Sequence, residues 1–216
     1  MKYHLLLFIF LVTFLFSSCS KVKTTYWPNG NKKTEIEVKG SKHEGEARYW
    51  FENGKLQMEC NYTNNVLEGN MKRYYASGNL EEEMQYHNGL LEGKSVKRDM
   101  SGKVFSESTY KNGKLNGRYA EYYPDKTLRI EGFYKNDNHD GTWFYYNTSG
   151  KIVGEGRFDN GNGIQKVYYE NGITRQLTHY KNDMKEGEEV FFKPDGAIES
   201  IHHYRQGKLI SKNDMD

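Results

Sequence analysis

The chain is dominated by a repeat of 24 residues, which constrains its fold more than any other feature. Three markers recur in phase: a first turn glycine, an aromatic residue and a second glycine. The first series is Gly30, Gly54, Gly78, Gly102, Gly150, Gly172 and Gly196, with Lys126 where a glycine would fall. The second glycine series is Gly45, Gly69, Gly93, Gly117, Gly141, Gly163 and Gly187, and the aromatic series is Tyr62, Tyr86, Tyr110, Tyr134, Phe158, Tyr180 and Tyr204. Each series contains one shorter step of 22 residues. Such a period is typical of arrays whose units bury surface only against their neighbours.

Two kinds of turn signal alternate along the repeats. One contains the first glycine, as in Asn53-Gly54, and the other follows the pattern of Asn64-Asn65 or Asn112-Gly113. Such pairs tolerate positive φ and favour tight hairpins, and the stretches of roughly 6–8 residues between them suit strands. The sequence therefore predicts an all-β fold: an elongated, single-layer antiparallel meander of 24-residue hairpin repeats. With strands about 4.8 Å apart, seven repeats would span roughly 70 Å.

The register of the hairpins follows if residues 53 and 54 form a two-residue loop. Pairs on one face are then apolar, whereas the other face pairs opposite charges. The expected apolar pairs are Ala47 with Cys60, Tyr49 with Met58, Phe51 with Leu56, Tyr75 with Leu80, and Met71 with Met84. The expected pairs on the other face include Arg48 with Glu59, Trp50 with Gln57, and Lys72 with Glu83. Rings are expected over glycines or arginine in the pairs Tyr119–Gly132, Trp143–Gly156, Tyr145–Gly154 and Tyr122–Arg129, whereas Asp99 would oppose Val104.

The first 18 residues differ from the rest of the chain. Lys2 precedes an apolar run from Leu5 to Phe16, which ends in Ser17-Ser18-Cys19. A positive start, a short apolar segment and small residues are the parts of a secretory signal. The ending resembles a bacterial lipobox, which implies cleavage before Cys19 and lipidation of its thiol; an ordinary signal peptide is the alternative. We thus expect a signal peptide over 1–18, a tether over 19–25, the array over 26–211 and a solvated tail over 212–216.

Charge and cysteine content exclude several classes of function. After residue 18 the chain carries 30 basic and 29 acidic residues, which leaves no basic stripe for nucleic acid. Cys60 is then the one thiol besides Cys19, too few for an internal disulfide or a zinc site. Core packing is the expected role of Cys60.

No motif predicts catalysis, a cofactor or a metal. Six glutamates recur five residues after the first glycine position: Glu35, Glu59, Glu83, Glu107, Glu131 and Glu155. Equivalent residues lie two strands apart, roughly 10 Å, which is too far for two carboxylates to hold one calcium ion. The same spacing disfavours a shared metal at His179 and His203. Paired charges, with Arg48 and Lys72 as neighbours, are the expected role of the glutamates.

Aromatic residues supply the candidate contact surface. Most rings at the repeat spacing are expected to pack in the core, but rings on the more polar face would be accessible. The candidate protein-binding residues are Trp50, Tyr74, Tyr122, Arg129, Tyr146 and Tyr168. The structural turn residues are Gly54, Gly78, Gly102, Gly150, Gly172 and Gly196.

The segment Tyr110-Lys111-Asn112-Gly113-Lys114-Leu115-Asn116-Gly117 resembles the MORN repeat. Together with Asn53-Gly54-Lys55-Leu56 and the 24-residue step, it is similar to the bacterial MORN repeat variant found in YwqK-family antitoxin-like proteins. The resemblance covers about residues 26–211. It implies strings of hairpins that act as interaction surfaces, and the antitoxin label implies binding to a toxin. For an exported lipoprotein, that partner would be an incoming or exported effector.

We therefore expect a non-catalytic, lipid-anchored protein that presents a long β surface to another protein. Its predicted location is the cell envelope, at the outer membrane of a Gram-negative bacterium. The alternatives are a glycan- or peptidoglycan-binding module, suggested by the rings, and a structural spacer, suggested by the uniform repeats.

Overall fold

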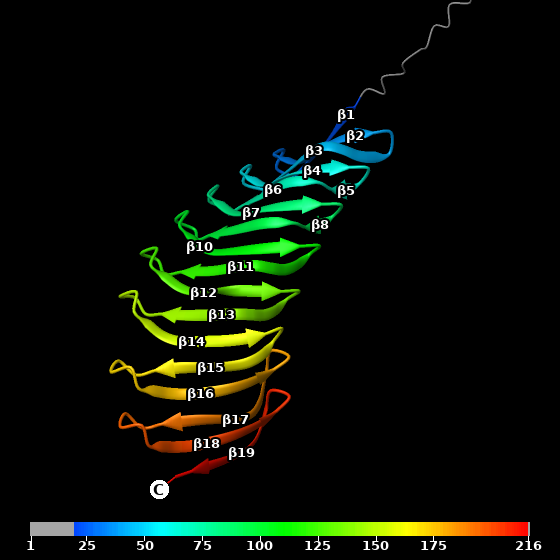
Figure 1. Cartoon of the computed structure of the whole chain (residues 1–216). Helices are drawn as coiled ribbons and strands as arrows, with labels where there is room; N and C mark the ends of the chain where they lie inside the picture. Colours follow the sequence, from blue (N-terminus) through cyan, green and yellow to red (C-terminus); the bar gives the residue numbers. More distant parts are fainter. Residues whose placement is uncertain (1–19, 216) are drawn as a thin grey trace, which may run out of the picture.

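The structure, a computed structural model, describes residues 20–215, which form one antiparallel sheet of 19 strands and no helix. Strands follow one another in space in chain order, and turns line the two long edges of the strip (Figure 1). The first strands are β1 (Lys21–Tyr26), β2 (Lys32–Lys39), β3 (Lys42–Trp50), β4 (Leu56–Thr63), β5 (Val66–Leu67), β6 (Gly69–Tyr74), β7 (Leu80–His87), β8 (Leu90–Leu91), β9 (Gly93–Arg98) and β10 (Val104–Lys111). They continue with β11 (Lys114–Tyr122), β12 (Leu128–Lys135), β13 (Asn138–Tyr146), β14 (Ile152–Asp159), β15 (Asn162–Tyr168), β16 (Thr174–Lys181), β17 (Met184–Phe192), β18 (Ile198–Arg205) and β19 (Lys208–Asp214). The predicted single-layer antiparallel meander is confirmed.

The ends of the sheet differ from the sequence-based boundaries. β1 occupies most of the expected tether and pairs with β2 from Lys21, opposite Val38, to Tyr26. β19 extends into the expected tail as far as Asp214, opposite Ser200. Both segments complete the hydrogen bonding of a strand that would otherwise be an open edge. The predicted signal peptide and Cys19 lie outside the described residues, and within residues 20–215 there is no helix that could cross a membrane.

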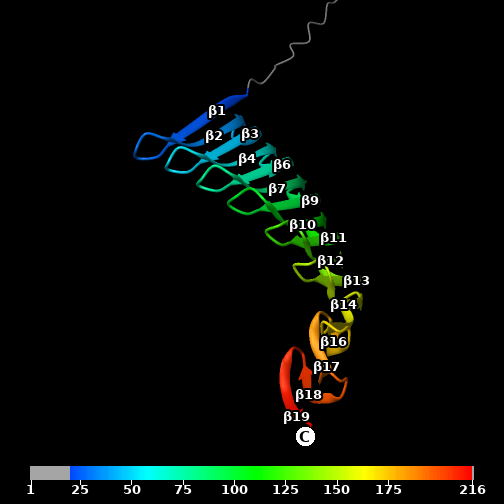
Figure 2. The same cartoon turned by 90° about the vertical axis from the view of Figure 1, so that its left-hand side faces the viewer.

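One face of the sheet, here called the inner face, carries most of the buried side chains, although Ala120 and Val190 on the opposite face are buried as well. Along it lie Ala47, Cys60, Met84, Trp143 and Thr178, all nearly inaccessible to solvent. Figures 1 and 2 show that the single layer is curved and twisted along its length. The ring of Trp143 covers Gly132, where a Cβ atom would meet it at 2.1 Å. Burial raises the pKa of the Cys60 thiol, in keeping with a packing role.

The predicted register is right in the strand bodies and wrong beside the first turns. Ala47 pairs with Cys60, Tyr49 with Met58, Arg48 with Glu59, Met71 with Met84, Lys72 with Glu83, Tyr119 with Gly132, Trp143 with Gly156, and Tyr145 with Gly154, as expected. Leu56, however, pairs with Trp50 and not with Phe51, so Gln57 has no partner. Likewise, Leu80 pairs with Tyr74 and not with Tyr75, and Val104 pairs with Arg98 and not with Asp99. Tyr122 pairs with Leu128 and not with Arg129.

The first turn has three loop residues, which explains this error. The amide of Gly54 donates to the carbonyl of Phe51 at 2.9 Å, and the amide of Phe51 donates to the carbonyl of Lys55 at 2.9 Å. Gly54 has φ +81°, as expected of a type I turn closed by a residue in the left-handed region. A one-residue bulge at Gln57 then restores the register. The second turns are the two-residue loops we expected, with positive φ at both Asn64 and Asn65.

The 22-residue step has a structural cause. Between β10 and β11 the register shifts by two residues, because Tyr110 pairs with Leu115 whereas Ser108 pairs with Tyr119. No such shift occurs between β14 and β15, where Phe158 pairs with Gly163 and Gly156 with Gln165. The short repeat has therefore lost the two-residue bulge that the 24-residue repeats carry. In Figure 2 the strip changes direction near this point, between β13 and β16.

Successive turns are joined along both edges. At the second turns, the residue before the second glycine accepts a hydrogen bond from the next turn: Glu44 from the Asn64 amide at 2.7 Å and Glu68 from the Asn88 amide at 2.8 Å. Glu92, Asp140, Asn162 and Glu186 do the same. At the first turns, Trp27, Tyr75, Tyr123 and Tyr169 donate to the carbonyls of Trp50, Arg98, Tyr146 and Phe192. Each repeat is thus fixed mainly by the next one.

Candidate interaction surface

The five candidate rings lie in one row on the face opposite the core, here called the outer face. Trp50, Tyr74, Tyr122, Tyr146 and Tyr168 each stand two residues after the central outer-face position of their strand, and all are half-buried. The slot between Tyr74 and Tyr122 holds Arg98. The structure therefore brings the predicted rings together on one face, at one position in each repeat.

The hydroxyl groups of these tyrosines bind the glutamate series. Tyr74 donates to Glu59 at 2.8 Å, and Tyr146 donates to Glu131 at 2.7 Å. The Tyr122 hydroxyl lies 3.4 Å from Glu107, and in the Arg98 slot the guanidinium pairs with Glu83 at 2.8 Å. Burial and the bond to Glu59 raise the pKa of Tyr74 to about 12, and burial and the bond to Glu131 do the same for Tyr146. The glutamates thus fix the ring positions.

Basic side chains complete the charge pairs that we expected for the glutamates. Arg48 lies 3.7 Å from Glu35, and Lys72 lies 3.5 Å from Glu59. Arg118 lies 3.5 Å from both Glu107 and Glu131. Exposed pairs of this kind contribute little to stability, so their main effect is to neutralise the face.

Arg129 is not part of this row. It is the unpaired bulge residue between Leu128 and Ile130, and its guanidinium forms an ion pair with Glu121. Glu121 lies on the inner face, where the hydroxyl of Tyr119 also donates to it. The expected stacking of Tyr122 on Arg129 is therefore wrong, because the bulge moves Arg129 out of register.

The chemistry of the outer face changes along the array. Its central row is charged in the N-terminal half, from Glu35 on β2 to Glu83 on β7. Beyond β15 the same row becomes apolar, with Leu177, Val190 and Ile201 as cross-strand neighbours. Phe192 and Tyr168 lie beside this apolar segment at the ring position. The C-terminal half consequently combines aromatic side chains, which are enriched at protein interfaces, with an apolar row in which Val190 is only 9% exposed.

The structure also gives the surroundings of the other residues that the sequence analysis considered. Within residues 20–215 no group of three or more His, Cys, Asp or Glu side chains could hold a metal ion. The Nδ1 atom of His179 lies 2.8 Å from the carbonyl oxygen of Glu188. The turn glycines Gly54, Gly78, Gly102, Gly150, Gly172 and Gly196 all have positive φ, as does Lys126 at 73°.

The sequence reasoning overlooked the residue that precedes each second glycine. Glu44, Glu68, Glu92, Asp140 and Glu186 accept the amide of a turn 20 residues later. An acid or amide recurring before glycine at the repeat spacing was the signal that could have identified them. Their role is to hold successive turns together. Because these groups are occupied by bonds within the sheet, the outer face is the candidate interaction surface.

Comparison with known proteins supports the repeat assignment. The family model "MORN repeat variant" matches residues 44–64, 67–88, 115–136, 140–160 and 162–182. The unmatched stretch between 88 and 115 contains the irregular slot of Arg98. No curated protein matches the chain. Among solved structures, a porin-like protein from Bacteroides uniformis ATCC 8492 aligns over 89% of this chain and 92% of its own, with 10% identity and a TM-score of 0.22. Five matches in phase with the hairpins of one open β sheet identify the chain as a member of the MORN repeat variant family.

Proposed function

We propose that this protein is a non-catalytic, lipid-anchored component of a bacterial cell envelope, at the outer membrane, whose outer face binds another protein. In the antitoxin-like version of this role, the partner is an incoming or exported effector that the protein neutralises. The binding residues are the five rings of the outer face together with the apolar segment beside Tyr168.

The row of rings is the observation that carries the proposal. Tyrosine and tryptophan are the residues that most often dominate binding energy at protein interfaces. Here they stand at one position in successive repeats, and the glutamates hold Tyr74 and Tyr146 in place. A side chain that is already ordered loses less conformational entropy on binding. A row of rings, two of them held by glutamates and the last, Tyr168, next to the apolar segment on β16–β18, therefore suits a protein partner.

The position of β1 supports an anchor close to the sheet. β1 begins at Lys21, two residues after Cys19. A lipid on Cys19 would consequently hold the N-terminal end of the strip against the membrane, and the C-terminal half of the outer face would extend away from it. Replacing Cys19 with alanine should move the protein from the membrane to the soluble fraction and abolish labelling by an alkyne fatty acid. Unchanged membrane retention would contradict the anchor.

The binding surface is tested by capture from detergent-solubilised envelopes. The wild-type protein should retain a stoichiometric protein partner, and the double variant Tyr146→Ala/Tyr168→Ala should lose it. The matched control is Tyr26→Ala, because Tyr26 is a tyrosine on the remote strand β1 with 61% of its surface exposed. Melting curves of all variants separate lost binding from lost folding. Equal capture by both variants would exclude this surface, and the absence of any partner would favour the structural spacer.

A further inference from the structure

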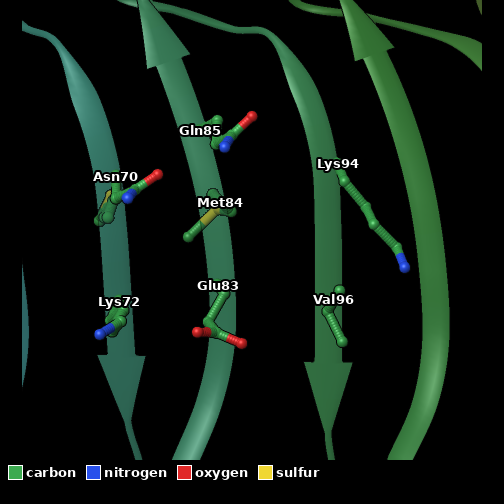
Figure 3. A pocket seen from close by; sticks show the side chains of 8 residues that line it. Asn70, Lys72, Glu83, Met84, Gln85, Lys94 and Val96 are labelled. Carbon is green, nitrogen blue, oxygen red and sulfur yellow. The ribbon is translucent and has the colours of Figure 1, made fainter.

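The N-terminal half of the outer face carries a second row of polar side chains, parallel to the rings. It comprises Glu46, Asn61, Asn70, Gln85 and Lys94, one from each of the strands β3, β4, β6, β7 and β9. Glu46 pairs with Asn61, and Asn70 pairs with Gln85. We call this row, together with Glu59, Lys72 and Glu83 beside it, the amide trough. Figure 3 shows its central part, with Asn70 and Lys72 on one strand and Glu83 and Gln85 on the next.

Two adjoining hollows lie along the trough. One hollow of about 240 Å³ is lined by polar and apolar side chains: Asn70, Met71, Lys72, Glu83, Met84, Gln85, Lys94 and Val96. A neighbouring hollow of about 200 Å³ is lined by Glu46, Glu59, Asn61, Asn70 and Lys72, among others. The two hollows share Asn70 and Lys72, so they lie next to each other along a line that crosses the strands. Such a shape accommodates a chain-like ligand.

Charged groups in and beside the trough already have partners inside the sheet. Glu46 pairs with Arg48 at 2.6 Å, and Lys94 pairs with Glu107 at 3.0 Å. The carboxylates of Glu59 and Glu83 are held by Lys72 and Arg98, respectively. Because these charges compensate one another, the trough has little net field with which to attract a charged ligand.

The three amides, in contrast, are free. The backbone carbonyls of Asn61 and Gln85 accept the amides of Glu68 and Glu92, but no partner within residues 20–215 is bonded to the side-chain amides of Asn61, Asn70 or Gln85. All three side chains are exposed. Each carboxamide offers two N–H donors and one carbonyl acceptor in a single plane. Neighbouring hydroxyl groups on one sugar ring present a matching donor and acceptor.

We propose that the amide trough binds a neutral, linear polysaccharide that runs across strands β3–β9. The free amides supply hydrogen bonds to hydroxyl groups, the compensated charges favour an uncharged ligand, and two adjoining hollows in line across the strands favour a ligand of several linked units. Of the apolar residues that line the trough, Met84 is buried, and neither Met71 nor Val96 is among the exposed large apolar side chains that could anchor a protein partner. It is therefore a site separate from the apolar C-terminal half assigned to the protein partner.

The test measures binding of three hexasaccharides, cellohexaose, chitohexaose and maltohexaose, to the full-length lipoprotein in a detergent without sugar groups. Isothermal titration should show saturable binding of at least one. The double variant Asn70→Ala/Gln85→Ala should bind that sugar about tenfold more weakly, because it loses two or more hydrogen bonds. Both side chains are exposed and unbonded, so the variant should fold normally. Glu188→Ala is the matched control, since Glu188 occupies the position of Asn70 in a C-terminal repeat and is also exposed.

Several outcomes would overturn the proposal. No binding of any hexasaccharide at millimolar concentration would do so, as would equal binding by wild type and the double variant. If an acidic hexasaccharide bound more tightly than the neutral ones, and salt weakened that binding, the site would recognise a charged ligand and not a neutral one. Loss of the envelope protein partner in Asn70→Ala/Gln85→Ala, without sugar binding, would assign the trough to the protein surface. Because the protein-binding test depends on Tyr146 and Tyr168, the two proposals can fail independently.

Discussion

Lys126 occupies a turn position that glycine holds in the other repeats. Its φ of 73° is in the left-handed region, like the 78° of Gly150 one repeat later. Its amide nonetheless donates to the carbonyl of Tyr123 at 2.8 Å, so the turn is formed as elsewhere. A side chain in this conformation is strained by about 1–2 kcal/mol.

Lys126→Gly should therefore stabilise the protein. Relief of the strain exceeds the added flexibility of glycine in the unfolded chain, so a gain of about 0.5–1 kcal/mol is expected. Gly150→Lys tests the same effect in reverse at the equivalent position and should destabilise by a similar amount. Urea unfolding at neutral pH measures both. Two variants that change stability in the same direction would contradict the explanation.

Tyr146 links stability to alkaline pH. Its pKa is about 12 in the folded protein, whereas an unfolded tyrosine titrates near 10. Below pH 10 the Tyr146 hydroxyl is protonated in both the folded and the unfolded chain, so its contribution to the free energy of unfolding is complete. Between about pH 10 and 12 the unfolded chain releases the proton more readily, so the free energy of unfolding falls as pH rises.

Tyr146→Phe should lower stability by about 1 kcal/mol at pH 7, because the bond to Glu131 is lost. The variant should also lose less stability than the wild type between pH 9 and pH 11. Unfolding in urea at the two pH values measures both effects. Tyr26→Phe, at an exposed tyrosine, is the control and should change neither. An identical pH dependence for wild type and Tyr146→Phe would contradict the raised pKa.

At the scale of elements, the strands follow from the sequence but the first turns do not. The side-chain pattern of the strand bodies fixes pairs such as Tyr49–Met58 and Met71–Met84, because a slip would reverse both faces. Asn53-Gly54 fits a two-residue loop and also the end of a three-residue loop. The one-residue bulge at Gln57 compensates for the longer loop, so the pattern beyond it cannot distinguish the two.

The short repeat acts on its neighbours through contacts that span more than one repeat. The Nδ1 atom of His139 lies 2.9 Å from Asp183, 44 residues away. The rings of His139 and Trp143 are 4.3 Å apart between centroids, and those of His139 and Phe158 are 5.2 Å apart. Where the two-residue bulge is missing, side chains from neighbouring repeats, such as His139 and Asp183, therefore come into direct contact.

Inserting Lys-Leu between Gly161 and Asn162 should restore a 24-residue repeat. The bulge would return, Asp183 would move away from His139, and the change of direction near β14 would be reduced. Small-angle scattering should show a longer maximum dimension for this variant. The same insertion after Gly113, in a repeat that already has its bulge, is the control and should disrupt the local register. An unchanged scattering profile would refute the link between the short repeat and the bend.

At the scale of the whole molecule, stability comes from contacts between neighbouring strands. Strand pairs such as β11–β12 and β17–β18 follow chain order, and the turn bonds reach the next repeat. The stability of such an array is approximately a sum of repeat and interface terms. Removing a terminal repeat should therefore leave the others folded.

Deletion of residues 193–216, which contain β18 and β19, should yield a folded sheet. Circular dichroism should retain the β signal, and the denaturant dependence of unfolding should fall roughly in proportion to the surface removed. Deletion of residues 115–138 from the middle removes one repeat and rejoins equivalent positions, and it should also fold. Complete unfolding of the terminal deletion would contradict the additive description.

How far the outer face could be predicted also depends on scale. The sequence placed Trp50, Tyr74, Tyr122, Tyr146 and Tyr168 on the more polar face, and the structure has them there. It did not reveal the bonds from Tyr74 to Glu59 or from Tyr146 to Glu131, because these partners are diagonal neighbours on adjacent strands. The free amides were also overlooked, because being unbonded is a property of the folded neighbourhood.

The turn-to-turn bonds along the second edge have an evolutionary consequence. Each acceptor, such as Glu44 or Glu68, finds its donor 20 residues later, and the same geometry recurs through the array. An in-frame duplication of 24 codons would therefore supply its own connections at both junctions. Recombination between such units could lengthen or shorten the protein, and could exchange one ligand-binding segment for another, without a new fold having to arise.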